Sequence, residues 1–427
     1  MSDVQFAAYA IIAAFSTYFC MYAFRKPFTA GKFEGTQVDL GFLPPVDYKI
    51  LLIVAQICGY MLSKFIGIKV VTEMSGKRRG LAIIVLILIA EVALGLFAIT
   101  PKPYNTIFLF INGLPLGMVW GLVFGYLEGR RVSEILGAGL SASYIVASGV
   151  VKTIGRVVVD DMGVSEEAMP FVVGLFFFPA MLGFVWMLTK LPKPSADDEA
   201  VRTRRAPMDK TQRRAFLKSY WPGLLALTFL YFFLTAYRSF RDDFAVEIWG
   251  QLGYGDTPSI LSTTELIIAF GILVALGLLY LVKDNRKALK YVHALMAFGT
   301  ALVGVATLLF QAGSIGPVVW MIGVGLGLYL AYVPFGCVLF DRMIAAVGFV
   351  ATAVFMIYVT DAVGYLGYVI VVFFKNFGAP ELSWLEFFTA FSYLTSVLCT
   401  VCFLVSMVYF MRKTRKASIG NSDLSPS

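Results

Sequence analysis

The 427-residue sequence has very little of what a water-soluble enzyme uses. Its only histidine is His293, so a histidine-based acyl-transfer or metal site has no set of ligands. No Gly-rich P-loop occurs, so nothing in the sequence would let ATP drive the protein directly. Charged residues make up only 15% of the chain, against 59% hydrophobic residues. These shortages argue against an enzyme and a nucleic-acid-binding protein, and we expect no cofactor.

Cysteines are also few, and all five lie inside apolar runs. Cys399 and Cys402 have the spacing of a redox pair, but no histidine or further cysteine cluster lies near them. We interpret all five as small, buried, apolar side chains.

What the sequence does have is a series of uncharged runs of roughly 20 residues, which is typical of transmembrane helices. These runs do not alternate between apolar and polar residues, as the strands of a membrane barrel would. The sequence therefore predicts an all-α polytopic membrane protein with twelve transmembrane helices. We expect them at 5–25, 49–68, 80–99, 105–127, 134–155, 168–189, 221–240, 261–282, 288–310, 316–340, 345–374 and 384–411.

The distribution of positive charge orients these helices. With the N-terminus inside, 24 of the 35 Lys and Arg residues lie in cytoplasmic segments and nine lie outside. By the positive-inside rule, both termini are therefore expected in the cytoplasm, with the lipid bilayer of the cell membrane (the inner membrane of a bacterium) as surroundings.

A long polar segment divides the helices six and six. We expect an N-terminal half at 1–190, a cytoplasmic linker at 191–220, a C-terminal half at 221–411 and a tail at 412–427. Within the linker, 209–219 is typical of a short amphipathic helix.

A short repeat relates the two halves. The segment from Tyr18 to Arg25 recurs 213 residues later, from Tyr231 to Arg238. The copies lie six helices apart, so both cross the membrane in the same direction, unlike the inverted repeats of five-plus-five transporters. Two parallel six-helix halves with a central cytoplasmic loop resemble the major facilitator superfamily (MFS) over essentially the whole chain.

Polar side chains in the repeat share one helix face, because they recur at spacings of three and four residues. They are Tyr18, Tyr22 and Arg25 in the first copy and Tyr231, Thr235, Arg238 and Asp242 in the second. A charge in a membrane helix costs roughly 2.5 kcal/mol or more, so it usually faces a water-filled cavity and has a function. Since guanidinium matches phosphate and carboxylate oxygens in pairs, the two arginines are candidates for an anion clamp. The alternative is that they are anchors whose side chains extend to the membrane surface.

The segment Tyr22-Ala23-Phe24-Arg25-Lys26, followed by Pro27, resembles the organophosphate:phosphate antiporter family of the MFS. The resemblance implies that Arg25 and Arg238 hold a substrate phosphate. The sequence departs from the family at 239–244, which is more highly charged and adds Arg241 as a candidate. The fifth helix offers Lys152 and no histidine.

Other charged residues in the helices leave alternatives open. Lys152 shares a face with Tyr144 and Ser148 and is either a third cationic contact or a lysine that extends to the surface. Asp361 could pair with an arginine, bind a cationic part of the substrate or carry a coupling proton. Glu91 and Glu265 are weaker candidates for proton carriers.

Charged loops predict conformational latches on the cytoplasmic side. The segment Glu73-Met-Ser-Gly76-Lys77-Arg78 resembles the acidic-x-x-Gly-basic loop of the MFS. Glu128 with Arg130, and Asp341 with Arg342, occupy corresponding places in the two halves. For the first of these segments, the alternative is ordinary positive-inside charge.

Glycines at four-residue spacing predict close packing of helices. They are Gly113, Gly117, Gly121 and Gly125 in the fourth helix, with Gly323 and Gly327 in the tenth.

These features favour a monomeric secondary transporter of a small organic anion, working by organophosphate/phosphate exchange. One alternative is a proton-coupled carrier of a carboxylate or drug-like compound that uses Asp361. Another is a transporter-like receptor that binds a sugar phosphate and signals through the 190–220 loop.

Overall fold

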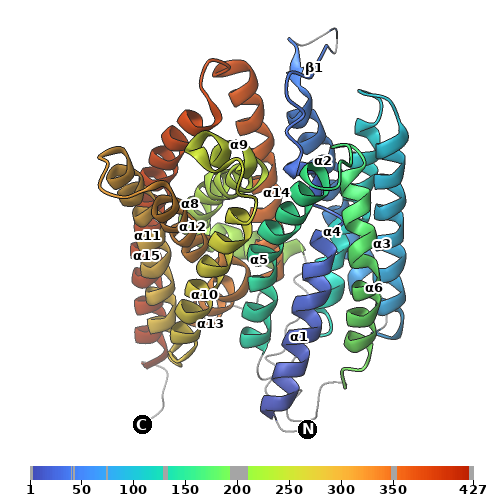
Figure 1. Cartoon of the computed structure of the whole chain (residues 1–427). Coiled ribbons are helices and arrows are strands. Elements are labelled where there is room, and N and C mark those ends of the chain that lie inside the picture. The colour runs from blue at the N-terminus through green and yellow to red at the C-terminus, as the bar shows by residue number, and fades with distance from the viewer. Residues whose placement is uncertain are drawn as a thin grey trace. The chain divides into compact units, whose positions relative to one another are not determined.

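Most of the chain is helical, as a computed structural model shows (Figure 1). The structure describes residues 3–39, 41, 44–73, 76–127, 133–192, 210–347 and 353–422. The strands in these ranges are β1 (Gln37–Val38) and β2 (Val46–Asp47), which pair antiparallel with Gln37 opposite Asp47. Away from its ends, a helix satisfies its backbone polar groups internally, which a segment in lipid requires.

The prediction of a polytopic membrane fold is confirmed. Eleven helices in the described ranges are long and apolar enough to cross a membrane. A further helix, α2 (Tyr48–Glu73), lies where the second of the twelve was predicted, but it carries Lys49, Lys64 and Lys69. The exposed side chains include many large apolar ones, such as Leu278, Leu281 and Phe270, which suits contact with lipid.

The helices form two compact units. The first contains the described residues up to 192 together with 239–269 and 369–388. Its elements from the first half are α1 (Asp3–Tyr22), the 3₁₀ turn η1 (Pro27–Ala30), α2, α3 (Gly76–Ile99), α4 (Thr106–Phe124), α5 (Ser133–Asp160) and α6 (Met169–Thr189). Within it, α1 packs against α5 and α6, and α3 packs against α4 and α6. Figure 1 shows α3 and α6 side by side.

Glycines bring α2 and α4 into close contact, as predicted. A Cβ atom at Gly113 would collide with the backbone of Gln56 and Tyr60, and one at Gly117 would lie 2.7 Å from the carbonyl oxygen of Tyr60. Gly59 of α2 abuts the backbone of α4 in the same way.

The second unit contains the described residues of 210–238, 270–368 and 389–422. Its elements, some of which extend into the first unit, are α8 (Lys210–Asp243), α10 (Ile260–Tyr280), α11 (Asn285–Gln311), α12 (Pro317–Pro334), the π-turn η3 (Phe335–Leu339), α13 (Phe340–Val347), α14 (Ala353–Phe373) and α15 (Trp384–Ser422). Gly299 and Gly327 let α11 and α12 approach closely. The first unit also holds α9 (Ala245–Trp249) and the π-turns η2 (Gly250–Tyr254) and η4 (Phe374–Gly378).

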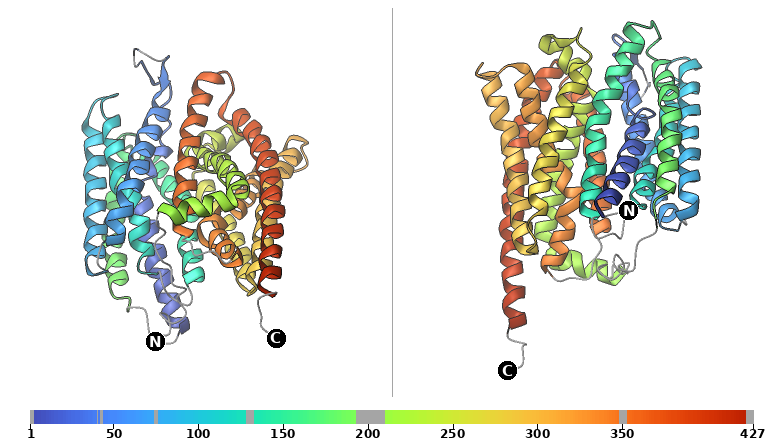
Figure 2. Two further views of the ribbon diagram at one scale, coloured as in Figure 1. Left: turned by 180° about the vertical axis from the view of Figure 1, so that it is seen from behind. Right: turned by 60° about the horizontal axis from the view of Figure 1, so that its bottom comes forward.

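Several helix boundaries differ from the predictions. The seventh helix begins at Lys210, so the amphipathic segment at 209–219 is continuous with α8 and is not a separate helix. The predicted start of the eleventh helix at 345 was wrong, because 345–347 extend α13, which buries Phe340 and Met343. The last helix continues through 412–422, beyond the predicted 411 (Figure 2). Lys and Arg are good helix formers, so a basic segment need not end a helix.

Candidate functional site

The first copy of the repeat places Arg25 just beyond a helix end. α1 ends at Tyr22, and the backbone N–H of Arg25 donates to the carbonyl oxygen of Tyr22 at 3.0 Å. The side chain of Arg25 is buried, with 5% exposed. Its guanidinium carbon lies 3.9 Å from the ring centroid of Tyr60 and 5.8 Å from that of Tyr22. Tyr18 packs edge-on against Tyr22. The buried cation thus lies on aromatic faces, whose quadrupole attracts it.

Side-chain amides hold this turn in place. Gln56 of α2 donates to the carbonyl oxygen of Arg25 at 2.9 Å and to Asn112 Oδ1 at 2.8 Å. Asn112 of α4 donates to the carbonyl oxygens of Phe24 at 3.0 Å and Ala90 at 3.1 Å. Carbonyl groups at a helix end lack hydrogen-bond donors within the helix, and the buried amides of Gln56 and Asn112 provide donors for them. Arg25 is therefore positioned by α2 and α4 as well as by its own helix.

The second copy places Arg238 inside a helix, since α8 continues to Asp243. Arg238 is 6% exposed, and its guanidinium carbon lies 5.0 Å from the ring centroid of Tyr332. Tyr231 stacks on Tyr332, with ring centroids 5.4 Å apart, and its hydroxyl donates to Asp361 Oδ1 at 3.0 Å. In the second unit, two tyrosine rings thus lie between the arginine and a half-buried carboxylate.

Acidic residues that follow Arg238 form buried ion pairs within the first unit. Lys26 Nζ lies 2.7 Å from Asp242 Oδ2 and also pairs with Asp243. Lys152 Nζ donates to Asp242 Oδ1 at 2.6 Å and to the Asp242 carbonyl oxygen at 2.6 Å. Ser148, one helical turn before Lys152, donates to the same carboxylate oxygen. Asp242 therefore receives two ammonium groups and a hydroxyl.

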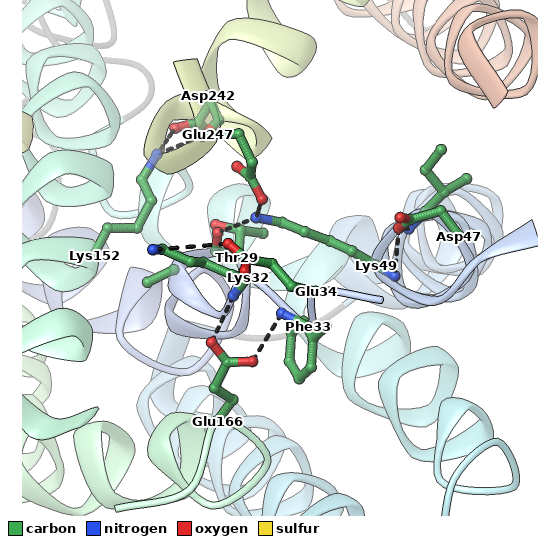
Figure 3. Close-up of polar contacts among 12 residues, drawn as sticks. Thr29, Lys32, Phe33, Glu34, Asp47, Lys49, Lys152, Glu166, Asp242 and Glu247 are labelled. Atoms are coloured by element: carbon green, nitrogen blue, oxygen red, sulfur yellow. Dashed lines mark hydrogen bonds and ion pairs between the residues drawn. The ribbon is translucent and has the colours of Figure 1, made fainter. Parts of the chain in front are cut away.

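A second pair extends this arrangement, as Figure 3 shows. Lys49, at the start of α2, pairs with Glu247 of α9 and donates to the Thr29 carbonyl oxygen at 2.8 Å. Burial raises the pKa of Glu247 above its usual value, while the ammonium of Lys49 opposes that shift. We call Lys26, Lys49, Lys152, Asp242, Asp243 and Glu247 the charge cluster.

The charge cluster joins segments that are far apart in the sequence. Its three lysines come from the first half of the chain and its three carboxylates from 242–247. The attraction within a buried pair is largely offset by desolvation, but removal of one partner costs about 3–5 kcal/mol because a charge stays buried and unpaired. The cluster therefore adds little net stability and strongly disfavours any state in which only one partner stays buried.

Comparison of the sequence with known protein families finds one match. A profile described as "Family of unknown function (DUF5690)" matches residues 27–413. The chain belongs to this family. No curated protein matches the sequence.

Solved structures of low sequence identity share the fold. A bacterial homologue of the human drug peptide transporters PepT1 and PepT2 superposes with a TM-score of 0.60 at 14% identity, covering 97% of this chain and 100% of that one. The MFS transporter FucP, in the outward conformation, gives 0.57 at 12% identity, covering 95% and 98%. The fold is therefore that of the MFS.

Two predicted substrate-binding cations are neutralised by carboxylates. Lys152 pairs with Asp242, and Arg241 Nη1 donates to Glu265 Oε1 at 2.6 Å. The pairing also occupies Glu265, one of the weaker proton-carrier candidates. The predicted shared face of Ser148 and Lys152 is present, and both residues bind Asp242.

Sequence reasoning did not single out Tyr60, Tyr332, Lys49 or Glu247. One signal was available for the ion pairs. Lys26 follows the arginine of the first copy directly, whereas the negative Asp242 and Asp243 follow that of the second copy four and five residues later. Opposite charges just beyond the two arginines favour pairing.

The predicted cytoplasmic latches lie only partly within the described ranges. Glu128 and Arg130 lie outside them, as does the link between Glu73, the last residue of α2, and Gly76, the first of α3. Arg78 is exposed, and its neighbour Arg79 donates to the carbonyl oxygen of Gly125. Arg342, next to Asp341, donates to Asn285 Oδ1 at 2.8 Å.

Proposed function

We propose that the protein is a secondary transporter that carries a small organic anion by alternating access, in which Arg25 and Arg238 bind the anion. The observation that carries the proposal is the burial of one arginine in each copy of the repeat. Each guanidinium lies against a tyrosine ring, at 3.9 Å for Arg25 and 5.0 Å for Arg238. Each guanidinium offers a planar fork of N–H donors that matches the oxygens of an oxyanion.

An organophosphate is the substrate class that we favour, with inorganic phosphate as the exchanged ion. A phosphate offers three oxygens and up to two negative charges, so two bidentate guanidinium groups can share it. The resemblance of Tyr22 to Lys26 to the organophosphate:phosphate antiporters supports this choice.

The charge cluster serves as a latch in this proposal. The positive-inside charge distribution puts the termini in the cytoplasm and hence the cluster at the outer end of the helices. Lys26 directly follows Arg25, and Asp242 lies one helical turn after Arg238. Opening to the outside would require the lysines to separate from Asp242, Asp243 and Glu247. We infer that anion binding at the arginines shifts the adjacent ion pairs. Binding of the anion would in this way control the opening of the transporter to the outside.

A ligand screen tests the proposal directly. The melting temperature of the purified protein is measured against inorganic phosphate, glycerol phosphate, sugar phosphates and simple carboxylates at constant ionic strength. A ligand present at 100 times its dissociation constant stabilises the folded state by about 2.7 kcal/mol. We expect stabilisation by phosphorylated ligands that Arg25→Ala and Arg238→Ala each abolish. Arg156→Ala is the matched control, because Arg156 pairs with Asp160. If phosphorylated ligands raise the melting temperature of both variants as much as that of the wild-type protein, the arginines do not bind the anion.

A second candidate function is proton-coupled transport through Asp361, favoured by its hydrogen bond from Tyr231. Uptake into liposomes distinguishes the two functions. Exchange driven by internal phosphate supports the antiporter. Uptake that is driven by a proton gradient and lost in Asp361→Asn supports the second candidate. Binding without any uptake supports the sugar-phosphate receptor.

A further inference from the structure

Glu91 is a carboxylic acid on the buried face of a helix that is otherwise apolar at this depth. On α3, Ile87, Ala90 and Leu94 are buried at helical spacing, and Glu91 belongs to the same face with 6% exposed. The opposite face, with Leu88 and Val92, is exposed as a lipid-facing surface would be. An apolar side chain would suffice here for packing, so the acid requires an explanation.

Among the described residues, no side chain near Glu91 pairs with its carboxyl group to stabilise a negative charge. Its carboxyl group lies against Gly174 of α6, where a Cβ atom would be 2.7 Å from the carboxyl carbon. Neither carboxyl oxygen has a hydrogen-bond partner among the described residues. The helices packed against α3 are α4 and α6, and neither contains an acidic, basic or other titratable residue. On α3 itself, the other charged residues are Lys77, Arg78 and Arg79, at its N-terminal end.

A carboxylate in such a place is far less stable than a carboxylic acid. Burial of an unpaired ionised group costs several kcal/mol, and a protein avoids this cost when the group takes up a proton. The members of the charge cluster face the opposite situation, because an ion pair compensates each charge. Glu91 therefore differs in kind from Asp242, Asp243 and Glu265.

A short hydrogen-bonded path joins this position to the first arginine. Asn112 donates to the carbonyl oxygen of Ala90, the residue before Glu91, and to that of Phe24, the residue before Arg25. Gln56 donates to Asn112 and to the carbonyl oxygen of Arg25. A shift of α3 against α6 would thus reach the turn that positions Arg25.

We propose that Glu91 is a proton-binding site that holds a proton while α3 and α6 are packed together and releases it to water when that contact opens. The step is the binding of one solvent proton to the carboxylate, and no other bond changes. Its part in transport rests on the proposed function above, whereas the protonation itself does not.

Infrared spectroscopy of the protein at neutral pH tests the protonation. The stretching band of a protonated carboxyl group is expected in the wild-type protein and absent from Glu91→Gln, which keeps the size and shape of the side chain. Identical spectra for the two proteins would overturn the proposal. A carbodiimide, which reacts with buried protonated carboxyl groups, is expected to label Glu91, and the labelled peptide is identified by mass spectrometry.

Packing and transport supply independent measurements. Gly174→Ala is expected to shift the carboxyl band, whereas Gly183→Ala on the same helix is a matched control, because nothing lies within 4 Å of its added Cβ. In liposomes that exchange the anion for internal phosphate, Glu91→Gln is expected to remove the effect of pH on the exchange rate. If no anion is transported by the wild-type protein, the proposed function fails while the infrared result still decides the protonation. If uptake is normal and the wild-type protein lacks the band, only the proton site fails.

Discussion

The two copies of the repeat place the same arginine in two different backbone settings. In the first copy the helix ends at Tyr22, and Arg25 lies on a turn before Pro27. In the second copy no proline follows, and α8 continues through Arg238 to Asp243. Proline lacks an N–H, so Pro27 cannot continue the helical hydrogen bonds of the first copy.

This difference separates two ways to fix a charged side chain. Arg238 is fixed by its position in a continuous helix. Arg25 depends on Gln56 and Asn112, which come from other helices. The residues that follow also differ in sign, since Lys26 meets Asp242 and Asp243 in the charge cluster. Both copies therefore carry the arginine, and the charges that follow it in the two copies are complementary.

The largest effect is expected at the acidic end of the second copy. Asp242→Asn removes a carboxylate that pairs with Lys152 and should lower the free energy of unfolding by about 3 kcal/mol. Asp243→Asn should lower the free energy of unfolding by less, because Lys26 still pairs with Asp242. Denaturation of both variants in detergent measures the difference. Equal losses would show that Asp242 has no central role, and Lys152→Met should restore part of the stability of Asp242→Asn.

The arginines themselves should respond alike despite their different settings. Arg25→Lys and Arg238→Lys each replace a planar fork with a point charge, which should weaken anion binding by ~10- to 100-fold. Arg156→Lys is the control and should bind as the wild-type protein does. Titration of the phosphorylated ligand against each variant measures the effect, and near-normal affinity in both would contradict the clamp.

The tyrosines beside the two arginines should differ in their effect on anion affinity, by a smaller amount than the arginine substitutions. Tyr60 lies nearer to its arginine than Tyr332 does, at 3.9 Å against 5.0 Å. Tyr60→Leu should therefore weaken anion binding more than Tyr332→Leu does. At the closer pair, the binding free energy should fall by about 1 kcal/mol. Phenylalanine keeps the ring and should restore most of the affinity at either position. A larger loss of affinity in Tyr332→Leu than in Tyr60→Leu would contradict this prediction.

The smallest effect is expected at Glu247, the last carboxylate after the second copy. Its pKa is raised by burial, so the folded state holds the proton of Glu247 more tightly than the unfolded state does. This contribution to stability is present in acid and is lost as the pH rises through the raised pKa. Glu247→Gln should remove that dependence, a change of about 1 kcal/mol or less. Melting temperatures from pH 4 to 8 measure it, and parallel curves for the two proteins would contradict the shift.

Much of this fold could be predicted from the sequence, because apolar runs of membrane length form helices whatever their neighbours are. The close approach of α2 and α4 followed from Gly113 and Gly117 for a similar reason, since a smooth helix face permits close packing in any arrangement. The end of the tenth helix could not be predicted, because a charged pair such as Asp341 and Arg342 is typical of a loop, whereas here it continues a helix that buries Phe340 and Met343.

The candidate site was harder to predict, because its partners are brought together only by tertiary packing. The repeat indicated Arg25 and Arg238, but Tyr60 and Tyr332 lie 35 and 94 residues further along the chain. Lys152 was expected to meet the substrate, and a sequence pattern could not show that Asp242 lies within 2.6 Å of it. Whether a buried cation is paired depends on residues that no local spacing reveals.

The boundary between the compact units has a consequence for fragments of the chain. The linker after 192 divides the sequence into halves, yet 239–269 and 369–388 belong to the same unit as the first half. A chain cut within 193–209 would give a first fragment whose Lys26, Lys49 and Lys152 have lost every carboxylate partner of the charge cluster. Co-expressed fragments should therefore reassemble and accumulate together, whereas the first fragment alone should be degraded. The charge cluster therefore makes the first half of the chain dependent on the second half to complete its fold.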